Sequence, residues 1–96
     1  MYEVDCREVK SFEGLIAAFN RGLIELVGGK WNGNLDAFND YLSWPESCPY
    51  ELVVLGREQC ARALNFKANP RHERDIWPLI EEILANNQEW VHVEYK

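Results

Sequence analysis

The stretch Leu52–Gly56, which reads Leu-Val-Val-Leu-Gly, decides the fold class. Four consecutive apolar residues before a glycine are typical of a strand in a parallel sheet that is covered on both faces. Polar and apolar residues alternate from Tyr2 to Cys6 and predict a first strand, while Trp90–Tyr95 predicts a last one. Because helical patterns separate these segments, the sequence predicts an α/β protein with a three-stranded parallel sheet and right-handed crossovers.

Two helices are expected between the first and second strands. Ser11 is a good N-cap for the first helix, which ends at Gly28-Gly29. One apolar stripe at helical spacing is formed by Phe12, Leu15, Ile16, Phe19, Leu23 and Leu26. After a loop from Lys30 to Gly33, Asn34 caps a second helix from Leu35 to about Leu42, which Trp44-Pro45 ends.

Two further helices are expected between the second and third strands. Arg57–Leu64 is a short helix, and Asn69-Pro70 interrupts it. Asp75 is expected to be the N-cap of a fourth helix, which ends at Asn86-Asn87. Its apolar stripe consists of Ile76, Leu79, Ile80, Ile83 and Leu84.

Composition limits the class of protein and of partner. The 96 residues, of which 47% are hydrophobic, suit a single domain over residues 1–96 and exclude a disordered chain. A net charge of -6 favours a basic partner over nucleic acid or an anionic membrane surface. The N-terminus does not read as a signal peptide, and no stretch reaches the length of a membrane span, so a cytoplasmic location is expected.

The unpaired cysteines and the basic stretch have simple interpretations. Three cysteines, Cys6, Cys48 and Cys60, suit reduced thiols in a reducing compartment, with a regulatory disulfide as the alternative. A solvated or internally paired face, rather than a nucleic-acid site, is predicted for the cluster of Arg57, Arg62, Lys67, Arg71 and Arg74.

The second predicted helix carries an unusual polar face. With Leu35, Phe38 and Leu42 directed at the core, the opposite side is shared by Asp36, Asn39, Asp40 and Ser43. Two like charges one turn apart, with Asp40 in the last turn, weaken a helix by a small amount. Tryptophans at both ends and a compact acidic surface suit a charge-steered protein interface, and a merely solvated helix face is the alternative.

The segment Gly33–Leu42, Gly-Asn-Leu-Asp-Ala-Phe-Asn-Asp-Tyr-Leu, resembles the second helix of the barstar family. The predicted order, with two helices in each crossover, is similar to the barstar fold over nearly the whole chain. Barstar-like proteins are small cytoplasmic inhibitors that plug the active site of a basic microbial ribonuclease with an acidic helix and the preceding loop, and some resemble immunity proteins. The resemblance therefore implies an inhibitor that is not an enzyme, needs no cofactor and is a monomer when free.

The resemblance also implies roles for individual residues. Asp40 would enter the phosphate-binding site of the ribonuclease, and Asp36 would add steering and an ion pair. Asn34 and Gly33 would shape the loop, and Trp44 matches an aromatic residue of the family. The implied partner-binding set is Trp31, Asn32, Gly33, Asn34, Asp36, Asn39, Asp40, Ser43 and Trp44.

The chain departs from the family pattern in the loop and before the fourth helix. Lys30-Trp31-Asn32-Gly33 replaces the usual tyrosine pair and glycine, so Trp31 is expected to supply the aromatic contact, and Lys30 introduces a positive charge. A further acidic residue is expected near the fourth helix, where both Glu73 and Asp75 are candidates.

Other kinds of chemistry have weaker sequence support. A zinc site would have to use Cys48, Cys60, His72 and His92, which lack the short spacing of metal ligands. A cysteine–histidine catalytic pair and an enzyme that uses Asp36 with Asp40 are alternatives without a recognisable motif. The main alternative is a barstar-like interaction module whose partner is not a nuclease.

Overall fold

A three-stranded parallel sheet forms the centre of the fold. The structure is a computed structural model in which residues 1–64 and 75–96 are described. In this part of the chain the strands are β1 (Tyr2–Asp5), β2 (Tyr50–Leu55) and β3 (Val91–Tyr95), in the order β1-β2-β3. Both pairings are parallel, with Val4 opposite Val54 and Leu52 opposite Val93. The predicted fold class is confirmed, and the apolar run of β2 occupies the central position.

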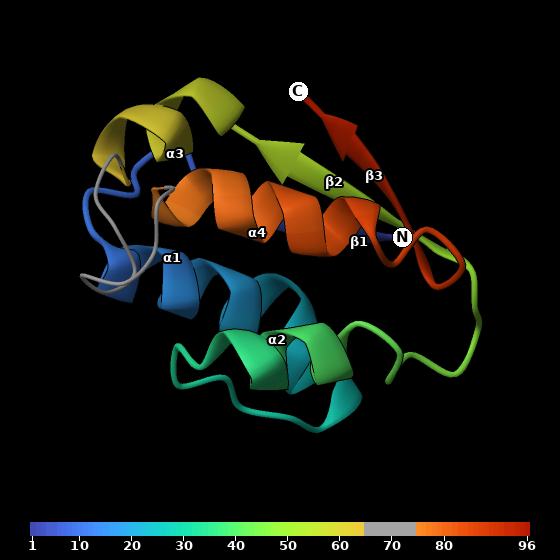
Figure 1. Ribbon diagram of the computed structural model, residues 1–96. Coiled ribbons are helices and arrows are strands. Elements are labelled where there is room, and N and C mark those ends of the chain that lie inside the picture. Colours follow the sequence, from blue (N-terminus) through green and yellow to red (C-terminus); the bar gives the residue numbers. More distant parts are fainter. Residues whose placement is uncertain (65–74) are drawn as a thin grey trace.

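The described residues form four α-helices, two in each crossover. Between β1 and β2 lie α1 (Phe12–Phe19) and α2 (Leu35–Tyr41), and between β2 and β3 lie α3 (Arg57–Ala63) and α4 (Ile76–Ala85). Figure 1 shows α4 running across the sheet with α1 beside it. The predicted order of elements is therefore confirmed.

Polar caps fix where the helices begin. Ser11 Oγ accepts a hydrogen bond from Gly14 N–H, and Asn34 Oδ1 accepts one from Ala37 N–H, so both predicted caps are confirmed. Asp75 occupies the N-cap position of α4, but its side chain makes no capping hydrogen bond. The expected interruption at Asn69-Pro70 lies outside the described residues.

The core lies between one face of the sheet and the helices. Alternate residues of β2, Tyr50, Leu52 and Val54, are buried within it because successive side chains of a strand point to opposite faces. Phe19 of α1 and Phe38 of α2 pack edge-to-face, with ring centroids 5.0 Å apart. This aromatic contact anchors the short helix α2 to the core.

The second face of the sheet is not covered as the sequence predicted. Glu3, Glu51, His92 and Glu94 are exposed there. Val53 is buried on this face but does not belong to the core cluster. The apolar run therefore predicts correctly where this strand lies in the sequence, but the predicted cover on its second face is wrong. Val53 is buried there because longer polar side chains surround it, and not because a second layer of helices covers it.

The first helix also differs from its prediction after Phe19. The chain continues as a π-helical segment, Asn20–Ile24, and a 3₁₀ segment, Glu25–Val27. The wider π turn changes the direction of the residues that follow it. Leu26, which the apolar stripe placed in the core, is 66% exposed, whereas Leu23 and Ile24 are buried.

Within residues 1–64 and 75–96, no helix is both long and apolar enough to cross a bilayer.

Candidate protein-binding site

The polar face of α2 is exposed as predicted. Asp36, Asn39, Asp40 and Ser43 all lie on the surface, whereas Phe38 and Leu42 are buried. The spacing of the apolar residues thus directs the acidic face outward. The helix begins at Leu35 and ends at Tyr41, close to the expected bounds.

The two carboxylates of this face have no partner within the described part of the molecule. Neither Asp36 nor Asp40 forms a side-chain hydrogen bond or an ion pair with residues 1–64 or 75–96. They lie one helical turn apart, so both can contact the same partner surface. Unpaired, solvated carboxylates attract cations without first breaking an internal ion pair.

Local hydrogen bonds order the loop that enters α2. Asn34 N–H donates to Asn32 Oδ1 over 3.2 Å, and Trp31 Nε1–H donates to Asn34 O over 2.7 Å. Gly33 has φ +102°, and a Cβ there would lie 3.0 Å from Ile16 Cδ1, so this position requires glycine. Asn32 and Asn34 are exposed at the beginning of the acidic face.

Trp31 is a correction to the predicted set of partner-binding residues. Its side chain is only 1% exposed. The indole packs against Phe12, Phe19 and Phe38, with centroid distances of 5.7, 6.1 and 4.8 Å. Trp31 therefore stabilises the base of the loop and is not available as an aromatic contact for a partner.

Trp44 lies at the opposite end of the helix and is 47% exposed. Its ring packs edge-to-face on Tyr41, with a centroid separation of 4.7 Å. Tyr41 is itself fixed, because its hydroxyl donates to Lys30 O over 2.9 Å. Trp44 thus presents a large aromatic surface on a rigid support beside Asp40 and Ser43.

Two buried asparagines form hydrogen bonds with the loop and with α2, a role that no sequence pattern predicted. Asn20 Nδ2–H donates to Trp31 O over 2.9 Å, and Trp31 N–H donates to Asn20 Oδ1 over 2.7 Å. Asn87 Nδ2–H donates to Asn39 Oδ1 over 2.8 Å and to Ile83 O over 2.7 Å. Asn20 and Asn87 are the buried polar residues of the described chain, and both contact the candidate site.

A tyrosine fixes the carboxyl end of α2. Tyr50 Oη–H donates to Leu42 O over 2.7 Å, from the first position of the central strand. Burial raises the pKa of Tyr50 above its usual value, which keeps the hydroxyl protonated as a donor. No sequence pattern joins Tyr50 to Leu42 or Asn20 to Trp31, because these contacts arise only when the chain folds.

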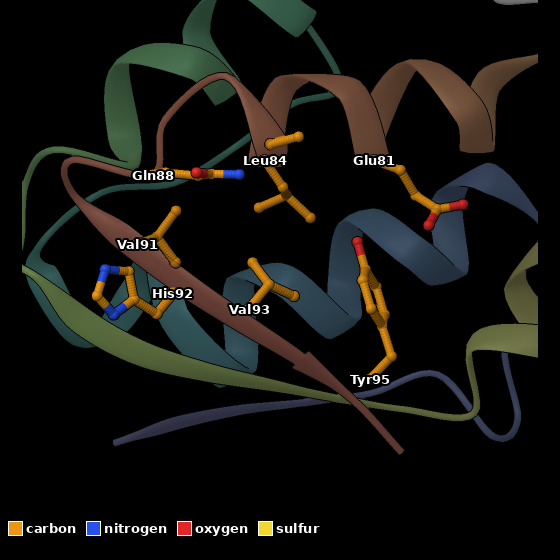
Figure 2. A pocket seen from close by; sticks show the side chains of 8 residues that line it. Glu81, Leu84, Gln88, Val91, His92, Val93 and Tyr95 are labelled. Carbon is orange, nitrogen blue, oxygen red and sulfur yellow. The ribbon is translucent and has the colours of Figure 1, made fainter.

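A groove lies between α4 and β3. It has a volume of about 420 Å³ and is lined by Glu81, Leu84, Ala85, Gln88, Val91, His92, Val93 and Tyr95. Figure 2 shows Leu84 and Val93 at its apolar floor, with Tyr95 directed toward α4. Burial and the nearby Glu81 carboxylate raise the pKa of Tyr95 to about 12, so its hydroxyl stays neutral. The groove lacks a nucleophile–base pair and does not contain Asp36 or Asp40.

The basic residues that the structure describes are paired or solvated. Arg57 forms an ion pair with Glu81 and stacks 4.3 Å over the ring of Tyr95. Arg62 is exposed and donates to Gln59 Oε1. The remaining members of the predicted basic cluster, Lys67, Arg71 and Arg74, and the acidic candidate Glu73, lie outside the described residues.

The cysteines are free thiols. Cys6 and Cys60 are buried, and Cys48 is half-buried. A hydrogen bond with Cys6, together with burial, raises the pKa of Cys60, so its thiol stays protonated. Within residues 1–64 and 75–96, no three histidine, cysteine or acidic side chains form a group that could hold a metal ion. His72, which the zinc interpretation needed, lies outside these residues.

A scan against protein-family models finds no match for this chain, and a search of curated proteins finds none either.

Proposed function

We propose that this chain is a barstar-like ribonuclease inhibitor or immunity protein that blocks the active site of a small basic microbial ribonuclease. The observation that carries the proposal is the pair of exposed carboxylates, Asp36 and Asp40, which have no ion-pair partner among residues 1–64 and 75–96. They lie on a short helix held by hydrogen bonds at both ends. The similarity of Gly33–Leu42 to the second helix of the barstar family supports the same function. The inhibitor would act in the cytoplasm, as a monomer when free.

The mechanism is steric and electrostatic. A ribonuclease binds the phosphates of RNA through arginine, lysine or histidine side chains, and a carboxylate can replace a phosphate oxygen as their acceptor. Asp40 takes this role, and Asp36 adds attraction one turn away. Because α2 is already ordered in the free protein, little conformational entropy is lost when it enters the active site.

The surrounding residues complete the proposed partner-binding surface. Asn32, Gly33 and Asn34 form the edge at the beginning of the helix, and the far edge is formed by Trp44, Ser43 and Asn39. Trp44 supplies the aromatic area that commonly anchors a protein interface. The helix and loop together act as a plug and do no chemistry of their own.

The test is inhibition of a panel of small basic microbial ribonucleases by the wild-type protein and by Asp40→Ala. We expect Asp40→Ala to weaken inhibition by about 10- to 100-fold, because a hydrogen bond to a charged group is lost. Glu13→Ala removes an exposed carboxylate from α1 and is the matched control, with a change below about twofold. Equal effects of the two variants would overturn the proposal. Capture of a non-nuclease partner through the α2 surface would instead support a barstar-like interaction module.

A further inference from the structure

The turn after α4 presents a second exposed tryptophan. Trp90 precedes β3 directly and is 37% exposed, and its neighbour Glu89 is also exposed. The other large apolar side chains exposed in the described chain are Met1, Leu26 and Trp44. Tryptophan is enriched where proteins bind other proteins.

Hydrogen bonds connect this turn to α2. Asn87 bridges the two elements, because its side chain donates to Asn39 Oδ1 and its carbonyl accepts from Trp90 N–H over 2.9 Å. The turn and the polar face of α2 are therefore neighbouring parts of one surface.

Tyr50 forms hydrogen bonds with both tryptophan-bearing segments. Its N–H donates to Trp90 O over 3.0 Å, and its hydroxyl donates to Leu42 O over 2.7 Å. Trp44 follows Leu42 by two residues, so Tyr50 contacts the chain close to both exposed tryptophans. Figure 1 shows the turn after α4 beside the segment that leads into β2.

The charges of these segments have one sign. Residues 31–56 contain Asp36, Asp40, Glu46 and Glu51 and no lysine or arginine. Residues 75–95 contain Asp75, Glu81, Glu82, Glu89 and Glu94, again without lysine or arginine. Glu81 and Glu94 are ion-paired with Arg57 and Lys96. A partner that spans α2 and the turn after α4 meets the exposed carboxylates of Asp36, Asp40 and Glu89 beside exposed indoles, which fits a basic protein.

We infer that Glu89 and Trp90 form a second arm of the partner-binding surface, which contacts the same basic ribonuclease that α2 plugs. This inference rests on the proposed function. Asp40 and Asp36 enter the active site, while Trp90 packs against the surface beside it and Glu89 pairs with a basic side chain on its rim. The hydrogen bond from Asn87 to Asn39 fixes the turn after α4 relative to α2, so both parts of the surface can contact the partner together.

The experiment compares two matched pairs of residues. Glu25-Leu26 has the same pattern as Glu89-Trp90, an exposed acidic residue followed by an exposed apolar one. Binding to the ribonucleases of the panel is measured for five variants: Trp90→Ala and Glu89→Lys, their controls Leu26→Ala and Glu25→Lys, and Asp40→Ala. Thermal unfolding of each variant checks that it is folded.

We expect Trp90→Ala to weaken binding by at least about fivefold, as loss of an aromatic anchor does. Glu89→Lys leaves the indole in place, tests the arm independently, and should slow association because it repels a basic partner. The changes at Glu25 and Leu26 should stay within about twofold of the wild type.

Each pattern of results decides between the two proposals. If Asp40→Ala weakens binding but the changes at Glu89 and Trp90 act like their controls, the second arm is wrong and the plug by α2 stands. If Asp40→Ala has no effect, the proposed function is wrong whatever happens at Trp90. Binding to no ribonuclease of the panel would count against both proposals.

Discussion

Two asparagine side chains, Asn20 and Asn87, are buried where apolar residues are the rule. A buried amide costs free energy unless its donors and acceptor are paired. The side-chain amide of Asn20 forms hydrogen bonds with both the N–H and the C=O of Trp31, and the amide of Asn87 donates to Asn39 on α2. Both amides therefore fix the position of the acidic helix, which has little buried area of its own.

Removing the Asn20 amide should loosen the loop before α2. In Asn20→Ala, the buried N–H and C=O of Trp31 lose their partners, so we expect the free energy of unfolding to fall by about 2–4 kcal/mol. Urea denaturation measures this, and hydrogen exchange should show faster exchange of the α2 amides. The exposed Asn86 provides a control, since Asn86→Ala should change stability by less than about 0.5 kcal/mol. A similar small change in both variants would contradict the positioning role of Asn20.

At the scale of the element, the π-helical segment Asn20–Ile24 has a clear structural effect. It packs against β1 at Gly22, where an added Cβ would lie 2.2 Å from Glu3 O. Only a glycine allows this approach of two backbones. The segment also carries Asn20 at its first position, so the same irregular turn brings the helix close to the sheet and the amide to Trp31.

Gly22→Ala should destabilise the protein, because the obstacle is backbone rather than a movable side chain. We expect a loss of at least about 1–3 kcal/mol in the free energy of unfolding, measured by urea denaturation. Gly14 offers the matched comparison, since a Cβ there would meet nothing closer than Ser11 Oγ at 3.6 Å. Gly14→Ala should be neutral or stabilise by up to about 1 kcal/mol, because alanine favours the helix. A loss of stability in Gly14→Ala as large as that in Gly22→Ala would show that close packing at Gly22 is not the cause.

At the scale of the whole molecule, ion pairs of the described residues gather at the end of the sheet where the strands finish. The strands begin near the acidic segments that carry Trp44 and Trp90. They end near Arg7, Arg57 and Lys96, which form ion pairs with Asp5, Glu81 and Glu94. The contact with Arg7, which includes hydrogen bonds, lowers the pKa of Asp5 to about 2. Carboxylates without such pairing remain at the other end, and we expect them to orient that end toward the proposed basic partner before contact.

The asymmetry predicts how salt affects association. Glu46→Gln combined with Glu89→Gln removes two exposed charges from the acidic end. We expect this variant to associate about two- to fivefold more slowly with an inhibited ribonuclease at low salt, and at the wild-type rate near 1 M salt, where the Debye length is about 3 Å. Stopped-flow fluorescence measures both rates.

The control for this prediction removes the same charge elsewhere. Glu13→Gln combined with Glu25→Gln changes two exposed carboxylates of the segment from α1 to the 3₁₀ turn. Equal slowing by the two double variants would mean that net charge alone, and not its distribution, governs association.

The sequence by itself determined the order of the elements and the orientation of α2. Periodicity and capping are local properties, so Ser11, Asn34 and the spacing of Phe38 and Leu42 were sufficient to predict helix starts and an outward acidic face. The continuous apolar run of β2 likewise predicted a strand of a parallel sheet.

The tertiary structure alone decided which aromatic side chains a partner can reach. Trp31 is enclosed by rings from α1 and α2, whereas Trp90 is left exposed, and both are tryptophans in short connections. The π turn after Phe19, which turns Leu26 outward, depends on the approach of Gly22 to β1. Burial is set by neighbours that are distant in the sequence, and therefore hydrophobic spacing predicts the helix but not the surface it finally presents.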